Sequence, residues 1–194
     1  MSIIRLENAS VVRNGRCILD GIDFSFDGGS AAIYGAPKSG KTTLCDVISG
    51  ITKLTEGTRT LCGQIAVVSG AAALFPELTI KRNIAIYSAK EHMVQDSMKY
   101  CGITDFGGAL PKNLDLGRNA LAKLACAVAS NPDILLCDDC EAGLTCTERD
   151  NILNLILGSG LPAVIITGSK NTAVRCDSIF ALEDGRLNRI EEWS

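Results

Sequence analysis

The sequence predicts an α/β protein built on a mostly parallel, twisted sheet, with an antiparallel β flap and a small helical insert. Short apolar runs alternate with helix-like stretches and turn dipeptides along the chain, which is typical of a sheet covered by helices. A glycine-rich loop at residues 35–40 separates an apolar run from a helical stretch, as in a strand-loop-helix unit of a parallel sheet. The 194 residues hold no internal repeat or low-complexity linker, so we expect one domain over residues 1–194.

The flap is predicted from the N-terminal part of the chain. Three strand-like pieces lie at residues 3–6, 9–12 and 22–26. The dipeptides Asn14-Gly15 and Asp20-Gly21 lie between them, and such dipeptides mark turns. Short connections of this kind favour antiparallel pairing of the three pieces.

The next elements begin the parallel sheet and the insert. Apolar runs predict buried strands over residues 30–34 and 65–68, and a helix over residues 42–49 ends at Gly50. The insert covers about residues 71–130 and should hold three helices, over 79–87, over 90–100, and from an Asp115 N-cap to about residue 130.

The last third of the chain returns to the sheet. Short apolar runs predict buried strands over residues 133–137 and 163–167, with a helix over residues 147–157 between them. The dipeptide Asp184-Gly185 then predicts the turn of a hairpin formed by residues 179–182 and 186–190.

Composition excludes several classes of function. Lys and Arg number 19 against 22 Asp and Glu, a formal charge of −3, which argues against nucleic acid as a partner. His92 is the only histidine, so a metal site built from several imidazoles is excluded. Nine scattered cysteines with no signal peptide at Met1 predict reduced thiols and a cytoplasmic location, and no apolar run is long enough to span a membrane.

One motif carries a specific chemistry. Residues 35–42 match G-x-x-x-x-G-K-[ST] between a predicted strand and a predicted helix, the context of a P-loop. Backbone N–H groups of such a loop and the helix N-terminus surround phosphate oxygens, Lys41 reaches the β and γ phosphates, and the Thr42 hydroxyl binds Mg²⁺. The sequence therefore predicts a P-loop NTPase fold that binds ATP and Mg²⁺ through Gly35, Ala36, Pro37, Lys38, Ser39, Gly40, Lys41, Thr42 and Thr43.

Two acidic residues complete the predicted site. Asp138 ends the apolar strand and should be the carboxylate that holds Mg²⁺ together with Thr42. Asp139 follows it and is a weak candidate for orienting an attacking water, with Lys41 as the second catalytic candidate. Cys137 and Cys140 flank this pair, and their C-x-x-C spacing leaves three interpretations open: a zinc site, a redox pair, or the favoured one, small core residues.

Several segments in order resemble the ATP-binding cassette family, the nucleotide-binding subunits of membrane transporters. Besides the P-loop, the resemblance is carried by residues 18–22, 74–80 with Asn83, 131–139, 142–144 and 182–186, and it covers almost the whole chain. It implies two cassettes facing head to tail, with ATP held between the P-loop of one and the signature loop of the other. It also implies a membrane-embedded transporter subunit as partner, received by the helical insert, and a peripheral location at the inner face of a membrane.

The chain departs from the family pattern where the family hydrolyses ATP. In the signature loop, Asp115 stands in place of a serine and Leu116 in place of a glycine; Asp115 is more readily explained as a helix N-cap. Other departures are Gly70 for a glutamine, Gly168 for the switch histidine, Asp139 for the catalytic glutamate, Thr145 for a loop aspartate, and Arg13 near the position of the adenine-stacking aromatic residue. Arg13 could stack on the base through its guanidinium instead.

These observations predict an ABC-type subunit that binds ATP·Mg²⁺ and regulates or supports a membrane transporter with little or no hydrolysis. A second cassette, identical or different, is the expected partner besides the membrane subunit. Two alternatives within the family are an active transport ATPase that tolerates the substitutions and a soluble scaffold protein. A small-molecule kinase fits less well, because the late strand with Asp138 and Asp139 and the terminal hairpin do not match it.

Overall fold

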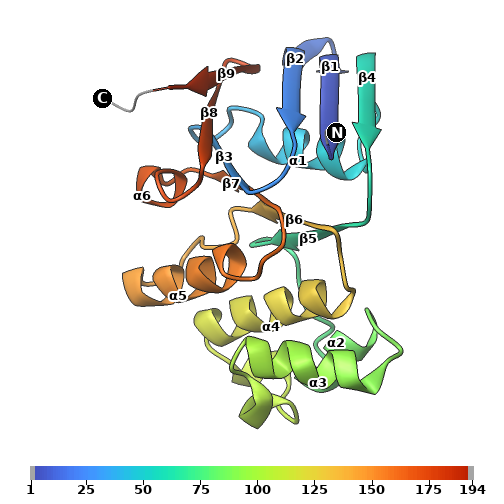
Figure 1. The fold of residues 1–194 in the computed structure, drawn as a ribbon, viewed down its shortest axis with the longest axis vertical. Coiled ribbons are helices and arrows are strands. Elements are labelled where there is room, and N and C mark those ends of the chain that lie inside the picture. Colours follow the sequence, from blue (N-terminus) through green and yellow to red (C-terminus); the bar gives the residue numbers. More distant parts are fainter. Residues whose placement is uncertain (1–2, 192–194) are drawn as a thin grey trace.

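The computed structural model describes residues 3–191 and arranges them in layers (Figure 1). A three-stranded sheet lies at one end, a six-stranded sheet crosses the middle, and the helical insert lies at the other end. The predicted α/β class, the mostly parallel sheet, the antiparallel flap and the helical insert are all confirmed.

The flap is the three-stranded sheet, in the order β2-β1-β4. Its strands are β1 (Ile4–Arg13), β2 (Arg16–Phe26) and β4 (Glu56–Leu61). The pieces at 3–6 and 9–12 were expected to be separate, but they form one strand with a bulge at Asn8, whose φ is +48°. The Asn14-Gly15 turn is confirmed, whereas the turn predicted at Asp20-Gly21 is wrong: Gly21, at φ +58°, lies inside β2.

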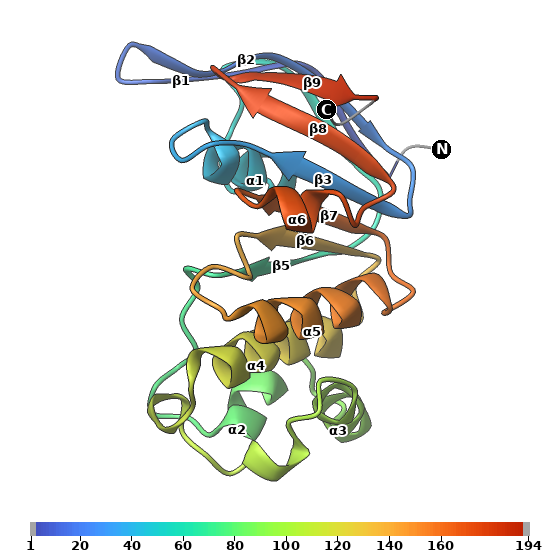
Figure 2. The same cartoon turned by 90° about the vertical axis from the view of Figure 1, so that its left-hand side faces the viewer.

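The central sheet has the strand order β5-β6-β7-β3-β8-β9, in which every neighbouring pair except β8 and β9 is parallel. The strands are β3 (Ser30–Tyr34), β5 (Ile65–Ser69), β6 (Ile134–Asp138), β7 (Ala163–Thr167), β8 (Ser178–Glu183) and β9 (Arg186–Ile190). Parallel strands end at the same edge of a sheet, so the loops after β3, β6, β7 and β8 lie together at one edge (Figure 2).

Helices cover both faces of this sheet. Helix α1 (Lys41–Ser49) lies between the flap and the sheet, and α4 (Leu116–Ala129) and α5 (Cys146–Leu157) lie on the opposite side (Figure 2). The remaining helices are α2 (Ile80–Ala85), α3 (Glu91–Tyr100), the short α6 (Lys170–Ala173), and two 3₁₀ turns at Thr104–Phe106 and Pro111–Asn113. No helix within residues 3–191 is long and apolar enough to cross a lipid bilayer.

Two buried clusters of apolar residues meet at the central sheet. In β6, Leu135 and Cys137 belong to the cluster on the α4 and α5 side, while Ile134 and Leu136 belong to the cluster beneath the flap. Successive side chains of a strand point to opposite faces, which is why a strand buried on both faces is apolar throughout. All five residues of β6 are buried, so the strand is held rigidly at the centre of the molecule.

The apolar stretch at the start of the insert divides between core and surface. Ile80 and Ile84 are fully buried, whereas Phe75, Ile86 and Tyr87 are each more than half exposed. Phe75 precedes α2, and Ile86 and Tyr87 follow its last residue, so apolar side chains are exposed just before and just after this helix.

Candidate nucleotide-binding site

The predicted P-loop lies between the end of β3 and the start of α1. Gly40 is the N-terminal flanking residue of α1 and has a φ of +103°, which a residue with a Cβ rarely adopts. A Cβ at Gly35 would overlap the Ser39 hydroxyl and approach the Leu182 carbonyl oxygen at 2.9 Å. Both glycines are therefore required by the path of the loop, which wraps its backbone around the helix N-terminus.

Lys41 is almost fully buried and is held over this loop. Its Nζ donates to the Gly35 carbonyl oxygen at 2.9 Å and to the Ala36 carbonyl oxygen at 3.2 Å. It also lies 3.9 Å from Oδ2 of Asp139. The lysine predicted to bind phosphate is thus positioned at the mouth of the loop before any ligand arrives.

Asp138 ends β6 directly opposite the start of α1, and its side chain is 7% exposed. Burial raises the pKa of this carboxyl above its ordinary value, the charge of Asp139 raises it further, and a hydrogen bond with Thr42 acts in the opposite direction. Its Oδ1 is buried and has no hydrogen-bond partner among the described residues. A buried, unpaired carboxylate oxygen beside a threonine hydroxyl fits the oxygen ligands that Mg²⁺ takes.

Asp139 adopts a left-handed backbone conformation, with a φ of +44°. Its N–H donates to the Ile166 carbonyl oxygen, and its Oδ1 accepts from the N–H of Gly168 at 3.2 Å. The carboxylate is therefore fixed between β6 and β7 and directed towards Lys41, although its side chain remains 43% exposed.

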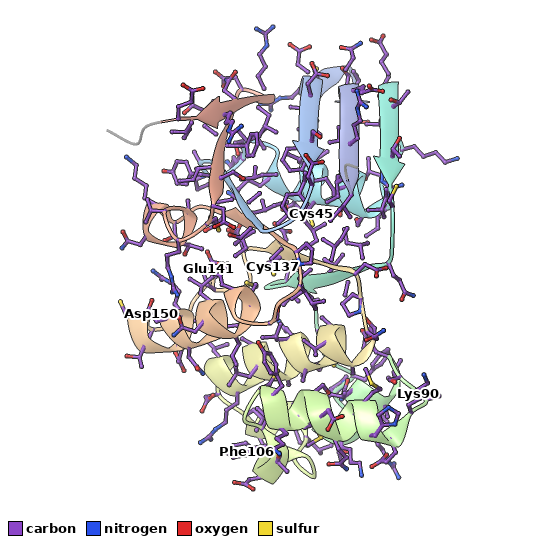
Figure 3. All side chains as sticks on the ribbon, viewed as in Figure 1. Cys45, Lys90, Phe106, Cys137, Glu141 and Asp150 are labelled. Carbon is purple, nitrogen blue, oxygen red and sulfur yellow. The ribbon has the colours of Figure 1, made fainter. Side chains whose placement is uncertain are left out.

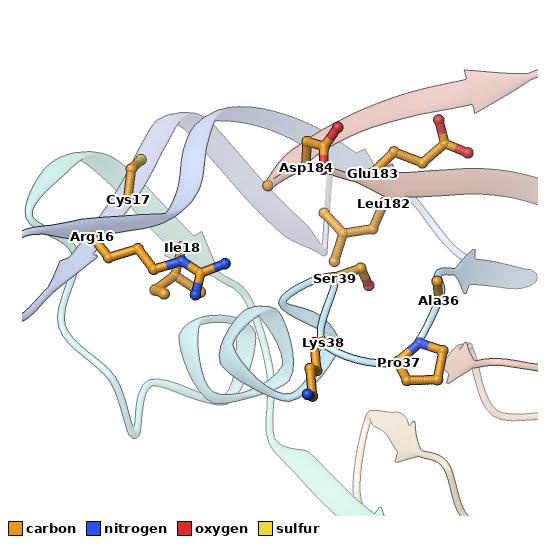
Figure 4. Close-up of a pocket in the computed structure, with 11 residues that line it drawn as sticks. Arg16, Cys17, Ile18, Ala36, Pro37, Lys38, Ser39, Leu182, Glu183 and Asp184 are labelled. Atoms are coloured by element: carbon orange, nitrogen blue, oxygen red, sulfur yellow. The ribbon is translucent and has the colours of Figure 1, made fainter.

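Lys41 and Asp139 line a cavity of about 510 Å³, together with Ile18, Pro37, Lys38, Gly40, Thr42, Thr43, Ala142 and Gly168. A second cavity, of about 780 Å³, adjoins it on the other side of the loop and shares Ile18, Pro37 and Lys38 with it (Figure 4). The predicted phosphate-binding residues and both predicted carboxylates thus converge on one place at the carboxyl edge of the sheet.

The signature segment is occupied by a helix cap. Asp115 is the N-cap of α4, as predicted, and its Oδ1 accepts from the N–H of Arg118 at 2.7 Å. Arg118 also lies 3.4 Å from Oδ2 of Asp115 and packs over the Phe106 ring. Leu116 is 65% exposed, so an apolar side chain projects from the first turn of the helix.

Two glycines replace side chains that the family resemblance would place beside the site, and their surroundings differ. A Cβ at Gly168 would lie 3.7 Å from the Gly35 carbonyl oxygen and 3.9 Å from the Lys41 Nζ, which is ordinary contact. A Cβ at Gly70 would overlap the backbone carbonyl oxygen of Asp139. Lys123 of α4 donates to the Gly70 carbonyl oxygen at 2.8 Å, so this loop is packed closely on both sides.

The structure adds three facts that the sequence interpretation did not provide. Glu141 is buried and hydrogen-bonded to the Thr167 hydroxyl, which ties the end of β6 to that of β7. Lys123 holds Gly70, as described above. Arg13, considered for stacking on the base, donates instead to the Thr52 hydroxyl at 2.7 Å.

The C-x-x-C pair lies in the interior. Cys137 is fully buried and Cys140 is 4% exposed. A hydrogen bond with Cys137, together with burial, raises the pKa of the Cys140 thiol. Cys45 and Cys137 both lie inside the molecule in Figure 3. Within residues 3–191 no group of three or more His, Cys, Asp and Glu side chains could hold a metal, which speaks against the zinc interpretation.

Comparison with known proteins agrees with this geometry. The profile of the ABC transporter family matches residues 19–142. An uncharacterised ABC transporter ATP-binding protein of Mycobacterium tuberculosis (strain CDC 1551 / Oshkosh) is 29% identical over 219 residues, covering 95% of this chain and 88% of that protein. An Fe(3+) ions import ATP-binding protein of Haemophilus influenzae (strain ATCC 51907 / DSM 11121 / KW20 / Rd) is 25% identical over 97% of this chain and 61% of its own length.

The fold itself is that of a known structure. The dimeric, post-hydrolysis structure of the ATP-binding cassette MJ0796 bound to ADP and Pi superposes with a TM-score of 0.85 at 21% identity, covering 98% of this chain and 100% of that one. The P-loop, the Asp138 strand and the matched family profile together lead to one conclusion: the chain belongs to the ABC transporter family and has the fold of its ATP-binding domains.

Proposed function

We propose that this chain is the ATP-binding subunit of a membrane transporter, and that it binds ATP·Mg²⁺ while hydrolysing it slowly or not at all. The observation that carries the proposal is an asymmetry within one site. Lys41, Thr42 and Asp138 are positioned for a nucleotide, whereas Gly70 and Gly168 provide no side chain beside Asp139.

Binding is assigned to residues that are already in place. Backbone N–H groups of residues 38–41 and the N-terminus of α1 surround the phosphates, and Lys41 exchanges its carbonyl contacts for phosphate oxygens. Thr42 and Asp138 hold Mg²⁺, which when bound neutralises charge on the phosphate oxygens. The unpaired Oδ1 of Asp138 gains the partner that it lacks within the described residues.

Hydrolysis is limited by what surrounds Asp139. Among residues 3–191, this carboxylate is the one proposed to orient a water. It is one methylene shorter than a glutamate, and an error of about 1 Å can cost on the order of 10²-fold in rate. No imidazole lies beside it, because position 168 is glycine and His92 lies exposed on α3 in the helical insert. The site therefore binds nucleotide but does not position the attacking water well for hydrolysis.

The exposed apolar residues of the insert are an argument for a protein as binding partner. Phe75, Ile86 and Tyr87 are exposed at the start of the insert, as expected of a surface that receives a membrane-embedded subunit. The relatives named above are ATP-binding proteins of transporters, one of them for iron import. We therefore propose a peripheral location at the inner face of a membrane, with a second cassette as a further partner.

Calorimetry with ATP and Mg²⁺, run beside a sensitive phosphate-release assay on the same preparation, tests this function. We expect binding that requires Lys41 and release that is slow or undetectable. Lys41→Ala should abolish the binding heat without lowering the melting temperature. Phosphate release at the rate of a working transporter, lost in Lys41→Ala, would establish the active-ATPase alternative. Absence of binding by the unaltered protein would refute the proposal.

A further inference from the structure

Lys38 has a backbone conformation that its side chain does not favour. Its φ is +69°, in the left-handed region, which is unfavourable for a residue with a Cβ. Within residues 3–191, every other residue at positive φ is a glycine, an asparagine or an aspartate, the types that tolerate this region. Lys38 is therefore the one residue kept in this conformation without a short polar side chain or the freedom of glycine.

The side chain of Lys38 is not engaged in the fold. It is exposed, and no ion pair or side-chain hydrogen bond joins it to another described residue. It lines the cavity that holds Lys41, Thr42 and Thr43, and also the adjoining larger cavity. Figure 4 shows it pointing away from the acidic residues Glu183 and Asp184 across that larger cavity, so these carboxylates do not hold it.

The balance of charges at the nucleotide site indicates a role for the Lys38 ammonium group. Within the described part of the chain, Lys41 is the one buried cation at the site. It lies 3.9 Å from the Asp139 carboxylate, while Asp138 adds a second acid nearby. Two acids against one fixed cation oppose the approach of a polyphosphate. A second ammonium group at the tip of the phosphate loop balances these charges, two against two.

We infer that Lys38 is a second phosphate-binding cation, whose side chain folds over the polyphosphate of a bound nucleotide opposite Lys41. The inference rests on the proposed nucleotide binding and extends it to a residue that determines affinity. The left-handed backbone of Lys38 directs its side chain towards the bound nucleotide. The protein bears the cost of this conformation even when no nucleotide is bound. Because an ammonium at this point meets the outer phosphates first, the effect grows with the number of phosphates.

The test compares two substitutions at Lys38 with a charge-matched control. Lys38→Asn removes the charge and suits a positive φ, and Lys38→Arg keeps the charge. Lys53→Asn removes an exposed lysine beyond the end of α1. Binding of ATP, ADP and AMP with Mg²⁺ is measured by calorimetry at low and high salt, and melting temperatures are recorded for every variant.

We expect Lys38→Asn to melt no lower than the unaltered protein, yet to bind ATP about five- to tenfold more weakly, with a reduced dependence on salt. The loss should shrink for ADP and vanish for AMP, while Lys38→Arg and Lys53→Asn bind nearly as the unaltered protein does. Equal ATP affinity in Lys38→Asn and the unaltered protein overturns the inference and leaves the proposed function standing. Failure of the unaltered protein to bind ATP overturns both.

Discussion

Asp138 shows how the burial of a single carboxyl group opposes folding. The pKa of this group is raised, so the folded protein binds its proton more readily than the unfolded chain does. Its contribution to the free energy of unfolding is therefore fully present below the unfolded pKa of 3.8, and it is lost as the pH rises through the raised folded value. Above that folded pKa the group is ionised at a cost to stability.

Asp138→Asn should remove that cost. We expect the variant to melt above the unaltered protein at pH 7, by about 2–4 °C for each kcal/mol recovered, and the difference to shrink towards pH 4. It should also lose the Mg²⁺-dependent part of ATP binding. Thermal unfolding across pH and calorimetry with and without Mg²⁺ measure both effects, with the exposed Asp105→Asn as control. A variant that binds ATP with undiminished Mg²⁺ dependence would show that Asp138 does not hold the ion.

Gly168 and Gly70, which stand in place of the histidine and the glutamine of the family pattern, should respond differently to substitution. Gly168→His places its Cβ at ordinary contact distance, so we expect a change in melting temperature of less than about 2 °C and a faster release of phosphate. Gly70→Gln drives its Cβ into the Asp139 carbonyl oxygen, and such crowding costs about 1–3 kcal/mol. Thermal unfolding compares the two variants, and equal melting temperatures would contradict the packing described at Gly70.

At the residue scale, the sequence predicted that the loop of residues 35–42 would follow a strand and precede a helix, because a motif with fixed spacing lies on one strand-loop-helix unit. It also placed Asp138 and Asp139 at the end of a buried strand, because a continuous apolar run precedes them. It did not locate Lys123 or Glu141. A lysine in a helix is usually a solvated side chain, and its contact with Gly70 joins residues 53 positions apart. Only the folded chain brings such pairs together.

At the scale of a single element, helix α4 shows what could be predicted from the sequence. Its start was predicted from Asp115 as an N-cap, and the hydrogen bond to the Arg118 N–H confirms the local rule. Strand β4 was not predicted, because five of its six residues are polar or glycine and its pairing partner β1 lies some 50 residues earlier. An element such as α4, which is marked by a local sequence pattern, was predicted. Strand β4, which forms only by pairing with the distant β1, was not.

The cap offers a test that separates stability from function. Asp115→Ala should lower the free energy of unfolding by about 1 kcal/mol, whereas Asp115→Ser keeps an oxygen acceptor and should change it by only a few tenths. Removing the carboxylate in Asp115→Ser should also favour association of two chains when ATP·Mg²⁺ is present. Urea unfolding measures the first effect and sedimentation measures the second. If Asp115→Ala unfolds as the unaltered protein does, the cap contributes nothing to α4.

At the scale of the whole molecule, the two apolar clusters share one sheet. Leu124 belongs to the cluster on the α4 side and Ile22 to the cluster beneath the flap, and both are essentially unexposed. Strands β6 and β7 contribute to both clusters. Unfolding of one cluster therefore exposes apolar residues of the strands that the other cluster shares. The overall layering was predictable from the alternation of apolar runs, but this sharing was not, because it depends on which strands become neighbours.

We therefore expect a single unfolding transition. Leu124→Ala and Ile22→Ala should each lower the free energy of unfolding by about 2–5 kcal/mol, and both should shift the entire transition. Far-ultraviolet circular dichroism follows the helices and hydrogen exchange follows individual strands in the same urea series. A variant Leu124→Ala whose helices unfold while β1 and β2 stay protected would reveal two independent units.

The close packing at Gly70 has a mechanical consequence. The Gly70 carbonyl oxygen accepts from the Lys123 side chain of α4, and the Gly70 N–H donates to the Asp138 carbonyl oxygen at 3.0 Å. The main chain at this point therefore joins the helical insert to the strand end that carries the acidic pair. The rotatable bonds of the Lys123 side chain are the compliant part of this link. They absorb a small displacement of α4, so only a movement that fully extends the lysine or breaks its hydrogen bond pulls on the main chain beside Asp138.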